Sequence, residues 1–97
     1  MTEVIDIEQF EKVAFILKTI AHPLRIRIAD LLSKHEELSV NEICAILGSE
    51  QSLTSHHLNT MKLKRVLNSK RQGQNVYYSL LLKEVKNVIS CIRNCNV

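Results

Sequence analysis

Apolar residues recur at helical spacing through the first two thirds of the chain. Positions i, i+3, i+4 and i+7 repeat between residues 7 and 20 and predict a first helix there. Its apolar stripe is Phe10, Val13, Ala14 and Leu17. Pro23 predicts the start of a second helix, since a proline in the first turn loses no hydrogen bond. The expected buried face of this second helix is Leu24, Ile28, Leu31 and Leu32.

Two further helices are predicted between residues 39 and 64. Ser39 and Glu42 have the spacing of a capping box and indicate the start of a third helix. Gly48 fits the left-handed residue that ends such a helix, and Ser49 is expected to cap a fourth helix that runs to about Lys64. Two short helices joined by a glycine-containing turn are typical of a helix-turn-helix.

After residue 64 the helical period gives way to alternation. Residues 66–71 alternate, and residues 75–80 are rich in strand-forming side chains, so a β-hairpin is expected with Gly73 in its turn. Helical spacing returns from Lys83 to Asn94, with the stripe Val85, Val88, Ile89 and Ile92. The predicted fold is mainly α with a small β-hairpin, in the order ααααββα, as a single domain over residues 1–97.

Composition excludes several classes of protein. With 45% hydrophobic residues and a mean hydropathy of −0.02, the 97-residue chain is expected to be neither disordered nor membrane-spanning. Acids stand at the start where a secretory signal would carry lysines, and three cysteines are an odd number for a disulfide scaffold. A cytoplasmic protein is therefore expected. Since no phosphate loop, metal quartet or carboxylate pair is recognisable, we expect neither an enzyme nor a cofactor.

The charges are distributed unevenly along the chain. The net charge is +3, but the 33 residues from 51 to 83 hold no acid and six bases. A segment of one sign concentrates positive potential on one part of the fold, which favours a polyanion such as double-stranded DNA.

The predicted fourth helix carries the side chains best suited to reading DNA. Its outer face lacks the Glu–Lys pairs of an ordinary solvated helix and offers short polar groups that reach base edges, with a lysine for phosphate. These candidate DNA-binding residues are Gln51, Ser52, Ser55, His56, Asn59 and Lys62. His57, about 100° away from His56 on a helix, is expected to pack inward, and His22 to cap or pack at a helix start.

The predicted hairpin supports the same function. Lys70 and Arg71 precede its tip and Gln74 lies in it, so the hairpin is expected to contact phosphates or the minor groove.

Three motifs together resemble the ArsR/SmtB family of bacterial repressors. They are the segment 50–58 (EQSLTSHHL), the segment 70–78 (KRQGQNVYY) and the segment 21–28 (AHPLRIRI), which is similar to the family's Pro-x-Arg-x-x-Ile pattern. The resemblance covers the chain in order. It implies a winged helix-turn-helix homodimer that binds an inverted-repeat operator. The family usually has a glycine at the end of the recognition helix, and Arg65 stands at that position here. The implied interface uses the first and last helices, through Phe10, Val13, Leu17, Val85, Val88, Ile89 and Ile92.

The family's metal sites are not expected in this chain. The cysteine positions of its third-helix site correspond to Ser39 and Asn41, which are poor ligands for a soft metal. The carboxylate and histidine positions of its last-helix site correspond to Leu82, Glu84 and Cys95, which do not make a zinc site. A thiol sensor through Cys91 and Cys95 and a noncognate metal site stay open as alternatives, and the inducer is unknown.

These patterns predict a sequence-specific DNA-binding transcriptional regulator, most simply a repressor that occupies its operator. The alternatives are a winged-helix interaction module without specific DNA binding and a regulator that responds to oxidation of Cys91 and Cys95.

Overall fold

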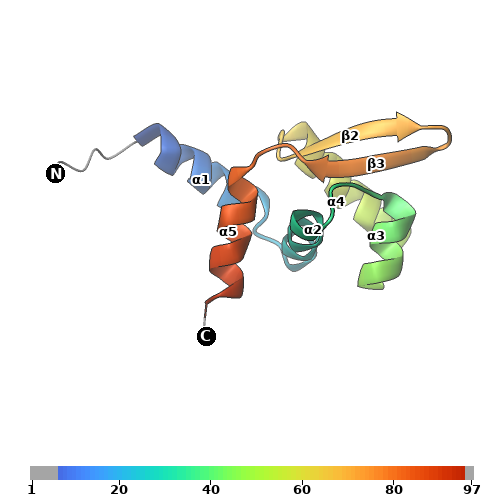
Figure 1. Cartoon of the computed structure of the whole chain (residues 1–97), viewed down its shortest axis with the longest axis horizontal. Coiled ribbons are helices and arrows are strands. Elements are labelled where there is room, and N and C mark those ends of the chain that lie inside the picture. The colour runs from blue at the N-terminus through green and yellow to red at the C-terminus, as the bar shows by residue number, and fades with distance from the viewer. Residues whose placement is uncertain (1–6, 96–97) are drawn as a thin grey trace.

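Five helices and three strands make up the computed structural model, which describes residues 7–95. In chain order they are α1 (Ile7–Thr19), α2 (Pro23–Lys34), β1 (Leu38–Ser39), α3 (Val40–Leu47), α4 (Gln51–Leu63), β2 (Leu67–Gln72), β3 (Asn75–Leu80) and α5 (Glu84–Arg93) (Figure 1). This order confirms the predicted helices and hairpin and adds β1. A strand of two residues is too short to show the alternation by which strands are recognised.

The capping residues predicted from the sequence set the ends of α2 and α3. His22 caps α2, where its Nδ1 accepts a hydrogen bond from the Leu24 amide at 3.2 Å. Ser39 and Glu42 exchange both hydrogen bonds of the capping box at the start of α3. Gly48 ends α3 in the left-handed conformation, with φ at 65°.

The cap of α4 differs from the prediction. Glu50, not Ser49, is the N-cap residue, and its carboxylate accepts a hydrogen bond from the Leu53 amide at 2.7 Å. The Ser49 hydroxyl oxygen instead accepts a hydrogen bond from the Thr54 hydroxyl at 2.7 Å. A carboxylate at the positive end of a helix gains charge–dipole stabilisation in addition to the capping hydrogen bond, which a serine does not.

Arg65 ends α4 in the left-handed conformation that the family resemblance assigns to a glycine. Its φ is 63°. The Arg65 amide donates to the Lys62 carbonyl at 2.9 Å, and the Val66 amide donates to the Met61 carbonyl at 3.0 Å. This pair of hydrogen bonds is a Schellman motif, and the buried Val66 and Met61 supply its usual apolar contact.

The three strands form one antiparallel sheet in the order β1-β3-β2. Leu38 pairs with Tyr78, and Leu67 pairs with Leu80. A two-residue turn joins β2 to β3, and Gly73 takes a φ of 64° at its first position, as a type II′ turn requires. Because directly paired residues share a face, these four side chains all turn toward the helices.

One apolar core takes side chains from every described element. The predicted inner face of α2 is confirmed, since Leu24, Ile28, Leu31 and Leu32 are all buried. The inner face of α4 buries Thr54, Leu58 and Met61. None of the described helices is both long and apolar enough to span a bilayer.

The apolar stripes of α1 and α5 differ from the prediction. On α1 the side chain that enters the core is Ile16, whereas Phe10 and Leu17 remain 62% and 45% exposed. On α5, Val85 and Ile89 were predicted to face a second chain, but both are buried inside their own chain. The reason is that α5 packs against α2 and α1, so these two side chains leave no surface for a partner.

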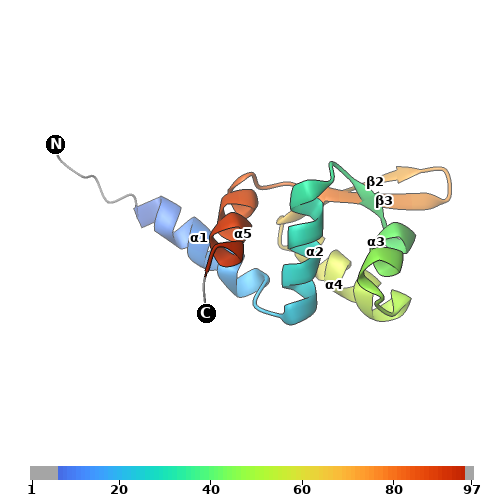
Figure 2. The same ribbon diagram turned by 60° about the horizontal axis from the view of Figure 1, so that its bottom comes forward.

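A narrower apolar surface remains at one end of the molecule. Figure 2 shows α1 and α5 side by side at this end, with α3, α4 and the hairpin at the other. Of the predicted interface residues, Phe10, Leu17 and Ile92 are exposed here, and Val13 and Val88 are half-buried.

Candidate nucleic-acid interface

The outer face of α4 presents the polar side chains that the sequence singled out. Exposed along it are Gln51, Ser52, His56, Asn59 and Lys62, with Ser55 half-buried beside them. The opposite face of the helix is fixed in the core, so the helix cannot rotate these groups away without exposing that face. That they contact DNA stays a prediction.

Part of this face opens into a concavity between α3, α4 and the hairpin. Its volume is about 180 Å³, and it brings Gln51 and Ser55 of α4 together with Gln74 of the turn. Asn41 and Asn75 line the same concavity, and sequence reasoning missed both. Neither lies on a periodic face, so only the folded arrangement places them here. Uncharged amides and hydroxyls of this kind both donate and accept hydrogen bonds, as base edges require.

An apolar side chain at the end of α4 also lies on this surface, and the sequence pattern did not predict it as a site residue. Leu63 follows Ser52, His56 and Asn59 at helical spacing on the same outer face, and it is 72% exposed. An apolar group on a DNA-facing helix suits the methyl group of thymine.

The two bases of the hairpin lie on opposite faces of the sheet. Lys70 pairs with Tyr77 and Arg71 pairs with Val76, so successive side chains point to alternate faces. The Lys70 Nζ lies 3.6 Å from the carboxylate of Glu37. Arg71 has no ion pair within residues 7–95 and shares its face with Val76, which lines the concavity. Arg71 is therefore more available than Lys70 to contact a DNA phosphate.

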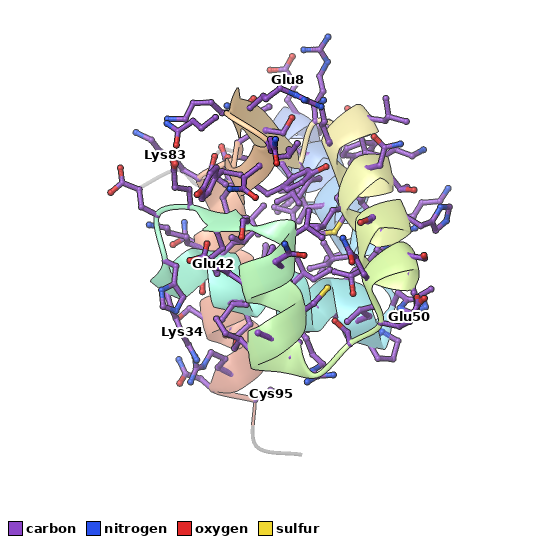
Figure 3. All side chains as sticks on the ribbon, turned by 90° about the vertical axis from the view of Figure 1, so that its right-hand side faces the viewer. Glu8, Lys34, Glu42, Glu50, Lys83 and Cys95 are labelled. Carbon is purple, nitrogen blue, oxygen red and sulfur yellow. The ribbon has the colours of Figure 1, made fainter. Side chains whose placement is uncertain are left out.

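Carboxylates near this surface are already engaged. Glu50, at the turn between α3 and α4, caps α4, and Glu37 faces Lys70. In Figure 3, Glu50 lies at that turn, and Lys34 and Lys83 lie across the molecule from the outer face of α4. The surface formed by α4 and the hairpin therefore keeps the positive character that the acid-free segment predicts.

A buried histidine fixes the inner side of α4. His57 is 5% exposed, as predicted, and its Nδ1 accepts a hydrogen bond from the Arg25 Nε at 2.9 Å. Burial, and then the neighbouring His22, Arg25 and His56, hold the pKa of His57 below its usual 6.5. His56 itself is exposed on the outer face.

The positions that correspond to the family's metal ligands have structural roles here. Ser39 is used in the capping box of α3, and Glu84 forms an ion pair with Lys12 at 2.9 Å, which keeps the pKa of that carboxyl below its usual value. Within residues 7–95, no three His, Cys, Asp or Glu side chains come together as a metal site would require.

The three cysteines are all free thiols in the described part of the chain. Cys91 and Cys95 are exposed at and just beyond the end of α5, and Cys44 on α3 is half-buried. Cys91 lies within α5 whereas Cys95 lies two residues beyond its end at Arg93, so the two thiols do not share one helical face.

Comparison with known proteins places this arrangement in a family. The model for the bacterial regulatory proteins of the arsR family matches residues 22–69, from the cap of α2 into β2. The transcriptional repressor PagR of Bacillus anthracis is 41% identical over 88 residues, which cover 91% of this chain and 88% of PagR. Its crystal structure aligns with a TM-score of 0.77 at 40% identity, over 90% of this chain and 99% of that one.

Two more relatives extend the similarity. HlyU from Vibrio cholerae N16961 aligns with a TM-score of 0.78 at 32% identity, over 88% of this chain and 91% of that chain. The regulator YgaV of Escherichia coli K12 is 33% identical over 95 residues, covering 97% of this chain and 96% of YgaV. Similarity that runs nearly end to end, on the same winged helix-turn-helix fold, shows that this chain belongs to the ArsR family of bacterial regulatory proteins.

Proposed function

We propose that this chain is a repressor that acts in the cytoplasm as a homodimer, by binding an inverted-repeat operator. Family membership makes it a transcriptional regulator rather than an enzyme. The observation that carries DNA binding is the positive surface of α4 and the hairpin, whose carboxylate neighbours are already engaged. In this proposal α4 enters the major groove, the hairpin contacts the flanking backbone, and the concavity holds the edges of bases.

The apolar surface of α1 and α5 supports the homodimer. Phe10 and Leu17 of α1 and Ile92 of α5 are large apolar side chains that one chain leaves exposed, on two helices that lie side by side at one end of the molecule. A second copy related by a two-fold axis covers the same surface on both chains. It also sets two α4 helices about one DNA turn apart, which is the spacing that an inverted repeat recognises.

Repression rather than activation is proposed from the relatives. PagR, the more similar of the two, is named a transcriptional repressor, whereas HlyU of Vibrio cholerae is named a transcriptional activator. Occupation of a promoter needs no surface beyond the DNA interface and the dimer interface. Repression by occupation is therefore the simpler mechanism for the surfaces that this chain presents.

The test is selection of duplexes from a random pool, followed by binding of the winning sequence at several salt concentrations. We expect an inverted repeat, two chains per duplex, and a steep loss of affinity with salt. Each phosphate contact contributes a slope of about −0.9 in log–log terms. A winged-helix interaction module would give no enriched sequence and no salt-dependent duplex binding, and that result would overturn the proposal.

A thiol-responsive regulator is a second candidate because Cys91 on α5 and Cys95, two residues after its end, are both exposed near the proposed dimer surface. Peroxide would oxidise one thiol from each chain to an interchain disulfide, with reduction of the peroxide to water. If so, non-reducing electrophoresis shows a covalent dimer with altered operator affinity, and Cys91→Ser with Cys95→Ser shows neither.

A further inference from the structure

His57 and Arg25 connect the DNA-reading helix to the rest of the fold through two hydrogen bonds. The Arg25 Nε donates to the His57 Nδ1 at 2.9 Å, and the Arg25 Nη1 donates to the Thr19 carbonyl at 2.9 Å. One guanidinium on α2 therefore holds the last residue of α1 and the inner face of α4 together. Its rigid planar fork fixes the direction of both hydrogen bonds.

This connection exists only while His57 is neutral. An imidazole accepts at Nδ1 only if Nδ1 carries no proton, and a protonated imidazole donates from both nitrogens. Proton uptake would replace the hydrogen bond from Arg25 by two donors, and two positive charges, facing each other at 2.9 Å.

Nothing around His57 compensates a positive charge. The ring centroid of His22, the N-cap residue of α2, lies 4.3 Å away, and the ring centroid of His56 on α4 lies 5.5 Å away. Together with Arg25, these are the charged or titratable groups that act on His57 among the described residues, and none is a carboxylate. From α1, the Thr19 backbone carbonyl enters the connection only through Arg25.

We propose that Arg25 and His57 are positioning residues for α4, and that proton uptake by His57 releases the helix from its DNA-reading position, so that acidification weakens operator binding. This inference rests on the proposed DNA-binding function. Coupling of the two helices through a proton gives the regulator a response to acid that needs no bound effector.

Electrostatics alone predicts the opposite response. Acid makes the net charge of any protein more positive, and positive charge favours the phosphate backbone. Simple electrostatics therefore predicts tighter binding in acid, and only release of α4 predicts weaker binding.

The experiment measures operator affinity by fluorescence anisotropy from about pH 8 to pH 5.5 at constant ionic strength, for the wild type, His57→Asn and His57→Phe. Asparagine keeps an acceptor oxygen near the position of Nδ1 but does not titrate, whereas phenylalanine fills the space and leaves Arg25 without its acceptor. Because all three proteins retain His22 and His56, the ratio of their affinities isolates position 57.

We expect the wild type to weaken about two- to tenfold toward pH 5.5 relative to His57→Asn, as the neutral, binding-competent fraction falls. His57→Phe should bind more weakly than His57→Asn across the whole range, since only the conservative variant restores the acceptor. Parallel pH profiles of the wild type and His57→Asn would overturn the proposal. Absence of operator binding by the wild type at pH 8 would instead overturn the proposed function.

Loss of the whole fold must be separated from release of one helix. The unfolded chain takes up the His57 proton near 6.5 and the folded chain at lower pH, so the free energy of unfolding also falls as pH drops below 6.5. Far-UV circular dichroism and thermal melts at each pH show whether the chain remains folded.

NMR of the wild type tests the proposal without a variant. The His57 ring signals and the backbone amides of α4 should shift with the same midpoint while the amides of α3 do not. An α4 whose amides ignore the His57 titration would contradict the proposal.

Discussion

A left-handed arginine stands where α4 ends. Among residues 7–95, Arg65 is the non-glycine residue with a positive φ, at 63°. Such a conformation costs an L-residue about 1–2 kcal/mol. The chain tolerates the cost because the Schellman hydrogen bonds and the buried Val66 require a left-handed residue there. In return, Arg65 places a positive charge at the end of the helix that is proposed to read DNA.

Replacement of Arg65 should change the stability of the fold and the affinity for the operator in opposite directions. Arg65→Gly should raise the free energy of unfolding by about 0.5–1 kcal/mol, since relief of strain exceeds the added entropy of the unfolded chain. Urea denaturation measures this, with Lys64→Gly as a control that should destabilise because Lys64 has a negative φ of −83°. A destabilised Arg65→Gly would show that the arginine makes compensating contacts. Operator affinity of Arg65→Gly should fall, since one nearby charge is lost.

Base readout is also decided by single side chains. Alanine at Gln51, Ser55 or His56 should cost about 1–3 kcal/mol on the operator and much less on random DNA, because only the operator offers the matching base edges. Thr60→Ala is the matched control on α4, since the Thr60 hydroxyl bonds to the carbonyl of His56 in its own helix. Equal losses on both DNAs would show that these residues contact phosphate instead.

At the scale of elements, the two faces of the hairpin differ in the charge that they present. Lys70 is partly neutralised by Glu37 at 3.6 Å, and Arg71 on the other face is unpaired within the described residues. The sequence presents the two bases as equivalent neighbours. The strand register makes them inequivalent.

Single substitutions in the hairpin test this difference. Arg71→Ala should reduce the magnitude of the salt slope by about one, as expected for a lost phosphate contact, and Lys70→Ala should reduce it by less. Glu37→Gln, which frees Lys70, should strengthen binding to all duplexes. Equal effects of Arg71→Ala and Lys70→Ala, measured by anisotropy from low to high salt, would contradict the assignment.

At the scale of the whole molecule, one end carries the proposed DNA interface and the other leaves large apolar side chains exposed. The core uses side chains from every element, yet much of α1 remains exposed, including Phe10 at 62% and Leu17 at 45%. Ion pairs join α1 to α5 through Lys12–Glu84 and α2 to α5 through Asp30–Arg93. Exposed ion pairs of this kind contribute at most about 1 kcal/mol each. In the proposed homodimer, most of the further stabilisation would come from burial of these apolar side chains by a second chain.

Charge at the exposed apolar surface should therefore separate the chains. Leu17→Glu and Ile92→Glu should convert a dimer to a monomer in sedimentation velocity and weaken operator binding at least tenfold, since a carboxylate cannot be buried there without a partner. Leu63→Glu is a control for the oligomeric state alone, because Leu63 is more exposed at 72% and lies on the DNA-facing side of α4, outside the proposed dimer interface. A monomeric wild type, or an Ile92→Glu dimer with unchanged affinity, would rule out this interface.

Local rules made the helix boundaries and inner faces predictable from the sequence. Ser39 with Glu42, Gly48, Pro23 and Gly73 act through their own backbone or through neighbours within four residues, so no tertiary information was needed for them. The same holds for the buried faces of α2 and α4, where the helical period alone identifies one apolar side. The acid-free segment and the polar outer face of α4 gave most of the candidate site in the same way.

Only the tertiary structure decided which apolar stripe is covered by the chain itself. Periodicity shows that α5 has an apolar side, but the packing of α5 on α2 determines that Val85 and Ile89 are buried inside one chain while Ile92 is not. The pairing of Lys70 with Glu37, the placement of Asn41 and Asn75 beside Gln51, and the connection from Arg25 to His57 join residues far apart in the chain. Long-range contacts of this kind depend on how whole elements pack, and no local pattern encodes them.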